Sequence, residues 1–116
     1  MAIYSNLTVD QGSTFSVEID VTDSSGDPLN LTGYQVAGQI RKTYSSNTFT
    51  NFAASVYNNI GGVVKIELSA ATTNAMKAGR YVYDVEISRT INSVDEVTRI
   101  VEGQLELKPG VTKVIE

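Results

Sequence analysis

Apolar and polar side chains alternate with a period of two along most of this sequence, and that alternation limits the possible folds more than any other feature. It is clearest in residues 14–22, where Phe15, Val17, Ile19 and Val21 alternate with polar side chains. Successive side chains of a β-strand point to opposite faces of a sheet, so the pattern predicts strands with one wet and one dry face. Similar alternation marks residues 34–41, 64–68, 80–87 and 101–107, and weaker alternation marks residues 3–9 and 48–57.

Turn-forming residues separate these segments. Residues 23–28 include Gly26 and Pro28, and residues 58–62 are rich in Asn and Gly. Gly adopts positive φ easily and Pro cannot continue a strand ladder, so both stretches predict turns. Residues 69–79 differ, because they are rich in Ala, begin with Ser and end at Gly. They predict one or two helical turns that link two strands, with the Gly as the residue that ends the helix.

Three single residues carry more specific expectations. Met76, in the predicted helix, is expected to point into the core as a plug at one end of the molecule. Gly38 falls on the apolar side of its strand, where a bulge or a close neighbour would need the room. Arg99 interrupts the apolar face of the last strand, which predicts that the strand begins at an edge or contains a bulge there.

Together these elements predict an all-β fold. About seven strands in two sheets, with one short helix linking two strands, describe an immunoglobulin-like antiparallel β-sandwich. A chain of 116 residues is the usual length of one domain, so we expect a single sandwich domain over residues 1–116. The chain has no Cys and no Trp, the hallmarks of antibody domains, so the likeness to immunoglobulins is one of architecture.

Composition excludes several classes of function. The chain has no Cys and no His, which removes thiolate metal sites and nucleophiles activated by histidine. Its net charge is −4 with no basic cluster, so nucleic acid is not expected as a direct partner. There is no signal-like N-terminus and no run of about twenty apolar residues, so no membrane partner is expected either. We therefore expect a protein that is not an enzyme and that uses no cofactor.

Two sets of acidic residues are possible metal or acid–base sites. Glycine-rich phosphate loops are absent from the sequence, and no oxygen-ligand loop of the Asp-x-Asp-x-Asp-Gly kind is present. We therefore interpret both sets as solvated strand faces and turns, and we expect no catalytic residues and no metal site. The sets are Asp84, Glu86, Glu102 and Glu106, and Asp20, Asp23 and Asp27.

The two ends of the chain are the first candidate for partner binding. Terminal strands of a sandwich lie at sheet edges, where unpaired backbone groups and apolar side chains gain from burial against another molecule. The residues predicted to dock are Ile3, Tyr4 and Leu7 near the N-terminus and Val111, Val114 and Ile115 near the C-terminus.

A second candidate surface is the loop at residues 43–51. It is rich in Tyr, Ser and Asn, the composition of many recognition loops. Tyr44 and Phe49 are its candidate stacking rings. This loop supports an alternative function, that of an adhesion module for carbohydrate or a host surface.

Three segments of the sequence stand out together. They are Leu31-Thr-Gly-Tyr-Gln-Val-Ala-Gly-Gln-Ile-Arg41, Met76-Lys-Ala-Gly-Arg-Tyr-Val-Tyr-Asp-Val-Glu-Ile87 and Thr98-Arg-Ile-Val-Glu-Gly-Gln-Leu-Glu-Leu-Lys-Pro109. These segments resemble proteins of tailed bacteriophages, in particular small virion proteins of phages of cyanobacteria and other marine hosts. They also resemble the N-terminal immunoglobulin-like domain of phage baseplate upper proteins, and the resemblance as a whole extends from about Thr14 to Pro109.

The resemblance implies a structural protein of the virion. Its partners would be other virion proteins and, because virion lattices are symmetric, further copies of the chain. Capsid, neck, tail and baseplate all stay open as the place of docking.

Overall fold

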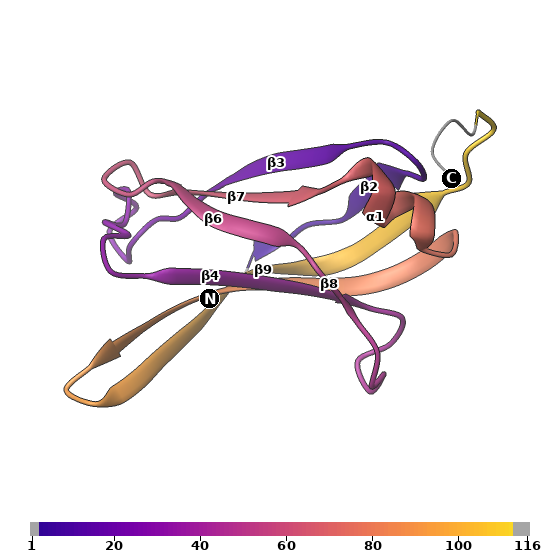
Figure 1. Ribbon diagram of the computed structural model, residues 1–116. Helices are drawn as coiled ribbons and strands as arrows, with labels where there is room; N and C mark the ends of the chain where they lie inside the picture. Colours follow the sequence, from indigo (N-terminus) through magenta and orange to yellow (C-terminus); the bar gives the residue numbers. More distant parts are fainter. Residues whose placement is uncertain (1–2, 113–116) are drawn as a thin grey trace.

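The computed structural model describes residues 3–112 and confirms an all-β sandwich of two sheets (Figure 1). The larger sheet has the order β1-β9-β8-β4-β5, with β2 also paired to β9, and the smaller sheet has the order β3-β7-β6. The larger sheet contains β1 (Ile3–Tyr4), β2 (Leu7–Asp10), β4 (Gln35–Arg41), β5 (Thr50–Asn51), β8 (Gly79–Ile91) and β9 (Val94–Lys108). The smaller sheet contains β3 (Phe15–Asp20), β6 (Ala53–Asn58) and β7 (Val63–Leu68).

The nine strand segments of the described residues correspond to about seven continuous strands, because two pairs of segments each belong to one strand. β1 and β2 are two pieces of one edge strand, since both pair with β9. β5 and β6 are one pass that changes sheets at Phe52, whose amide donates to the carbonyl of Gly38 at 2.9 Å. Counted in this way, the described chain makes about seven passes, as the sequence predicted.

One feature of the pairing differs from the prediction. β1 and β2 run parallel to β9, whereas the sequence predicted an antiparallel sandwich. The pairing joins the start of the chain to its last strand, with Ile3 opposite Val101 and Asp10 opposite Lys108. Two strands this far apart in sequence need no tight turn between them, so nothing forces them to be antiparallel.

The core lies between the two sheets and follows the alternation of the sequence. Val64, Ile66 and Leu68 of β7 face Val85 and other buried side chains of the larger sheet. Phe52 and Tyr83 meet edge to face, with ring centroids 5.9 Å apart. Each fully buried aliphatic or aromatic side chain contributes roughly 1.5–3 kcal/mol relative to an exposed one, so these layers supply most of the driving force for folding.

The expected helix is present and has the predicted length of one to two turns. α1 (Ala70–Ala75) begins at Ser69, whose hydroxyl accepts a hydrogen bond from the amide of Thr72 at 3.1 Å. Met76 follows as the C-cap and is buried in the core, as expected. Gly79 does not end the helix but opens β8, where its φ of 144° suits glycine. Within residues 3–112 no helix is long and apolar enough to span a membrane.

Gly38 has the close neighbour that its place on the apolar face predicted. A Cβ built there would lie 2.9 Å from the ring of Phe52. The missing side chain therefore lets Phe52 pack over β4 at the point where the chain changes sheets.

β8 and β9 continue past the two layers as a projecting hairpin (Figure 1). We call residues 88–99 the arm. The ladder shifts register so that Val85 pairs with Val101 and Glu86 with Arg99, which leaves Ile100 as the extra residue of a β-bulge. The bulge predicted near Arg99 is confirmed, and it turns the Arg99 side chain to the outer face of the sheet.

Candidate functional site

The predicted N-terminal docking residues lie on an edge strand of the larger sheet. Ile3 and Tyr4 are each 62% exposed, although their backbone pairs with β9 on the inner side. Their strand is thus an edge strand, as predicted. Its backbone hydrogen-bonds to β9 on one side and is unpaired on the other side within the described residues. Leu7 differs, because its side chain is partly buried against the core.

Between β1 and β2 the chain bends inward over Gly103. The amide of Ser5 donates to the carbonyl of Glu102 at 2.8 Å, and the hydroxyl of Tyr83 donates to the carbonyl of Ser5 at 2.6 Å. A Cβ on Gly103 would lie 2.0 Å from that Ser5 oxygen, so only glycine leaves room for the bend. Burial raises the pKa of the Tyr83 phenol above 10.0, against the opposing effect of the hydrogen bond to Ser5.

An apolar groove runs beside this edge strand. Its volume is about 280 Å³, and it lies between the start of the larger sheet and β3 of the smaller one. Ile3, Leu7, Val17 and Ile19 contribute side chains to its wall. The groove marks the open side of the sandwich, where two edge strands face each other without hydrogen bonds between their sheets.

The C-terminal docking residues are only partly described. Val111 is 97% exposed, while Val114 and Ile115 lie outside the described residues. The amide of Gly110 donates to the side-chain oxygen of Gln11 at 3.2 Å, which places Val111 at the far end of the edge from Ile3. The two sets of predicted docking residues therefore do not form one continuous site.

The loop after β4 holds the two predicted stacking rings in different ways. Tyr44 is 76% exposed. Phe49 is covered on one face by the guanidinium of Arg41, 4.8 Å from the ring centroid, and Arg41 also donates to the carbonyl of Ser46. Phe49 therefore helps to order the loop, and Tyr44 is the ring left free to stack on a ligand.

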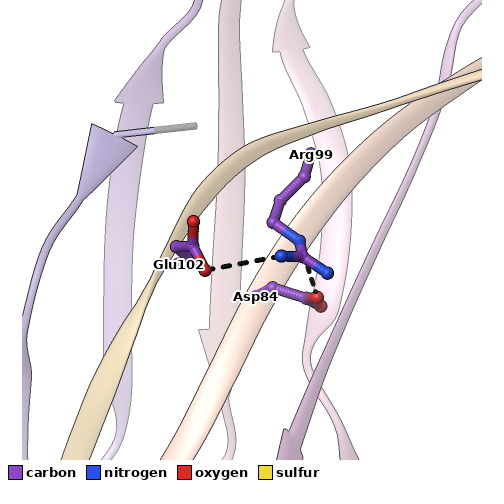
Figure 2. A network of polar contacts seen from close by, with 3 residues as sticks. All are labelled: Asp84, Arg99 and Glu102. Atoms are coloured by element: carbon purple, nitrogen blue, oxygen red, sulfur yellow. Dashed lines mark hydrogen bonds and ion pairs between the residues drawn. The ribbon is translucent and has the colours of Figure 1, made fainter. Parts of the chain in front are cut away.

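Tyr44 stands at the rim of a shallow depression on the outer face of the larger sheet. The depression has a volume of about 340 Å³ and extends over β4, β8 and β9. Three charged side chains line it, and Arg99 lies between Asp84 at 3.1 Å and Glu102 at 3.4 Å. Figure 2 shows these three side chains and the contacts that join them. The sequence predicted a bulge near Arg99 as one of two alternatives, but it did not give the register of β8 and β9, which brings Arg99 beside Asp84 and Glu102 on the outer face.

The acidic residues of this face behave as solvated strand residues. Arg99 forms ion pairs with Asp84 and Glu102, which are cross-strand neighbours, and all three side chains are at least partly exposed to solvent. Exposed pairs of this kind are worth about 0–1 kcal/mol. In the part of the chain that the structure describes, no three acidic side chains are grouped so as to hold a metal ion.

The arm is a surface that the sequence did not single out. Ile91, Val94 and Val97 are exposed on it, and Arg89 pairs with Glu96 at 3.0 Å. The available signal was the Asn92-Ser93 pair between two polar strand-like segments, since Asn tolerates the positive φ that a hairpin turn requires. That signal was weak because neither face of the arm is consistently apolar.

Comparison with known proteins identifies a shared fold. No protein-family model and no curated protein match the sequence. The solved N-terminal domain of ORF48 of phage TP901-1 superposes with a TM-score of 0.59 and 9% sequence identity. The match covers 90% of this chain and 85% of that one. The chain therefore has the fold of a phage protein domain, which agrees with the phage resemblance of its sequence at the level of the fold.

Two further solved structures are less similar. A family 123 glycoside hydrolase from Clostridium perfringens matches with a TM-score of 0.41 and 12% identity, over 95% of this chain and 24% of that one. AggA, the major subunit of aggregative adherence fimbriae type I from Escherichia coli, matches with a TM-score of 0.37 and 11% identity, over 90% and 89%. At these TM-scores neither match bears on function.

Proposed function

We propose that the chain is a structural protein of a tailed-phage virion, a non-enzymatic assembly or decoration module. The observation that carries this proposal is the fold it shares with the N-terminal domain of a phage protein over nearly the whole of both chains. The sequence segments that resemble phage virion proteins support the proposal independently of the fold.

The module docks on other virion proteins through its sheet edges. Exposed apolar side chains at Ile3, Tyr4 and Val111 lie along the edge formed by the N-terminal strand and the end of β9. The outer side of that edge strand presents backbone groups to which a partner strand can add. Capsid, neck, tail and baseplate are all compatible with docking of this kind.

Purified virions test the proposal. Antibodies raised against the chain are expected to label intact particles at one defined position by immunogold electron microscopy, and mass spectrometry is expected to find the chain in them. Loss of labelling from particles made without the gene is the control. Particles that carry none of the chain would contradict the proposal.

An alternative function is adhesion to carbohydrate or a host surface. The observation in its favour is Tyr44, which is 76% exposed beside a depression of about 340 Å³. A glycan array probed with the parent chain and with Tyr44→Ala would test it, with Tyr57→Ala as a matched exposed-tyrosine control. Loss of glycan binding in Tyr44→Ala alone would favour adhesion. If the parent chain binds no glycan on the array, the adhesion hypothesis is wrong.

A further inference from the structure

The arm carries a free strand edge. On the β8 side, β4 stops pairing at Ser88, and on the β9 side, β1 begins pairing only at Val101. Residues 94–100 of β9 therefore have no neighbouring strand on their outer edge in the described chain. A two-stranded ribbon is marginally stable alone, and a free edge of this length is a template for another strand.

The hairpin turn determines which backbone groups point outward. Asn92 and Ser93 both have positive φ, 52° and 65°, as in a type I′ turn, and Ile91 and Val94 flank them. Residues that flank such a turn form a hydrogen-bonded pair, and the pattern then alternates along the strand. The amides and carbonyls of Asp95, Val97 and Arg99 therefore face away from β8.

The sequence of this edge is complementary to itself. If β9 pairs with β9 of a second copy about a two-fold axis at Val97, each Asp95 lies opposite the other copy's Arg99. Val94 then lies opposite Ile100, and Val97 meets its own symmetry mate. Opposite charges placed directly across a strand pair are favourable, as are apolar pairs.

Neighbouring registers lose this complementarity. An axis at Asp95 or at Arg99 places like charges opposite each other, which is unfavourable. An axis at Glu96 or Thr98 places a charge opposite Val97. Only the axis at Val97 pairs the two opposite charges while using the whole free edge from Val94 to Ile100.

Burial also favours this pairing. Val97 is 56% exposed and Val94 is 65% exposed, although both lie in a regular ladder. The arm carries Arg89, Arg99, Asp95 and Glu96, so its formal charge is balanced and two arms do not repel each other. The edge contains no Lys or Pro, which commonly block edge-to-edge pairing.

We propose that the free edge of β9 in the arm pairs antiparallel with the same edge of a second copy, about a two-fold axis at Val97. The pairing closes about six backbone hydrogen bonds, two for each outward-facing pair of residues. It gives Val94 and Val97 apolar cross-strand neighbours and places the two sandwiches at opposite ends of a continuous ribbon. This inference stands on the arm alone and does not depend on the proposed virion role.

A proline substitution separates this pairing from the hairpin itself. The amide of Val97 faces outward, so Val97→Pro removes a donor from the intermolecular ladder and none from the ladder with β8. In sedimentation velocity over a range of concentrations, the parent chain is expected to form dimers and Val97→Pro to dimerise about tenfold more weakly or worse. Val97→Thr keeps the donor and is the matched control.

A charge exchange tests the register. Asp95→Arg alone places two Arg side chains opposite each other, and Arg99→Asp alone places two Asp side chains opposite each other. Both variants are expected to be monomers, while an equimolar mixture forms a heterodimer. Because Arg99 also pairs with Asp84 and Glu102, thermal unfolding must first establish that Arg99→Asp is folded.

Because the chain has no Cys, a single introduced thiol gives an unambiguous crosslink. Val97→Cys would bring two thiols together at a Cα separation of about 5.5 Å, within the range of a disulfide. Mild oxidation is expected to give a covalent dimer with Val97→Cys and not with Ile60→Cys, an exposed control on a different loop. A parent chain that stays monomeric at every concentration, or dimers that Val97→Pro leaves unchanged, would overturn the proposal.

Discussion

Gly103 is the residue over which the N-terminal strand bends. A Cβ there would lie 2.0 Å from the carbonyl oxygen of Ser5, and both atoms belong to backbone that has little freedom to move. Gly103→Ala is therefore expected to displace the junction of β1 and β2 and to lower the free energy of unfolding by about 1–3 kcal/mol. Urea denaturation followed by circular dichroism measures the loss.

Gly26→Ala is the control for that substitution. Gly26 has a φ of 84° but no atom within 4 Å of a built Cβ, so its cost of about 1 kcal/mol comes from backbone conformation alone. If Gly103→Ala were no more destabilising than Gly26→Ala, the close approach of Ser5 would not be a constraint in solution.

Tyr83 makes the same junction sensitive to alkaline pH. Its phenol is neutral when protonated, so its raised pKa means that the folded chain holds this proton more tightly than the unfolded chain, which releases it near pH 10.0. The corresponding stability is fully present below about pH 10 and is lost as the pH rises through the folded pKa.

Tyr83→Phe is expected to remove that part of the alkaline loss and to cost about 1 kcal/mol at neutral pH, where the hydrogen bond to Ser5 is missing. Unfolding free energies of both chains between pH 8 and pH 11 give the comparison. An identical pH profile in the two chains would mean that Tyr83 is not protected from solvent.

For single residues, the sequence predicted a contact only where the residue type interrupts a regular pattern of apolar residues. The room that Gly38 provides could be predicted because this glycine interrupts a run of alternating apolar residues. Gly103 sits on the inner face of an equally regular strand, yet its neighbour Ser5 is almost a hundred residues away in sequence. Contacts that depend on such distant pairing leave no local pattern.

Among the elements, the arm depends most on its turn. Ser93 has a φ of 65°, a conformation that costs a non-glycine residue about 1–2 kcal/mol. Ser93→Gly is expected to relieve about 1 kcal/mol and to slow amide hydrogen exchange in the arm roughly fivefold. Asn92→Gly, at the neighbouring position, should give less, because Asn tolerates positive φ better than Ser does. Equal gains would contradict the conformational explanation.

The sandwich strands were predictable and the arm was not, for one physical reason. Strands such as β3 and β7 have one face against the core, which imposes the period of two on their sequence. The arm has no core beneath it, so exposed positions such as Thr90, Asp95 and Val97 follow no inside and outside pattern. The alternation of apolar and polar residues arises where one face of a strand is buried. A ribbon that is exposed on both faces therefore shows little alternation in its sequence.

The candidate docking surfaces show the same limit. That Ile3 and Tyr4 lie on an edge strand followed from their place near the start of a sandwich. Their parallel partner, the partial burial of Leu7 and the cover that Arg41 provides to Phe49 all depend on tertiary packing. The sequence therefore indicated which residues could bind a partner. It did not indicate that these residues lie on separate surfaces of the molecule.

At the scale of the whole molecule, the arm should be dispensable for folding. Replacing residues 88–97 with Asn-Gly places a two-residue turn between Ile87 and Thr98, which are already cross-strand partners. The shortened chain is expected to retain its unfolding free energy within about 1 kcal/mol, because most removed side chains are exposed and the main loss is the contact of Arg89 with Tyr34. Urea denaturation checks this, and failure to fold would make the arm part of the cooperative unit.

The parallel pairing of the first strands with β9 also determines how the molecule carries tension. If Ile3 and Lys108 are pulled apart, the N-terminal strands and β9 must slide past each other, because they run in the same direction. They cannot separate one hydrogen bond at a time. The hydrogen bonds of that ladder then bear load together, in shear along the strands. A chain anchored near these two residues is therefore expected to resist stretching along the direction of these strands.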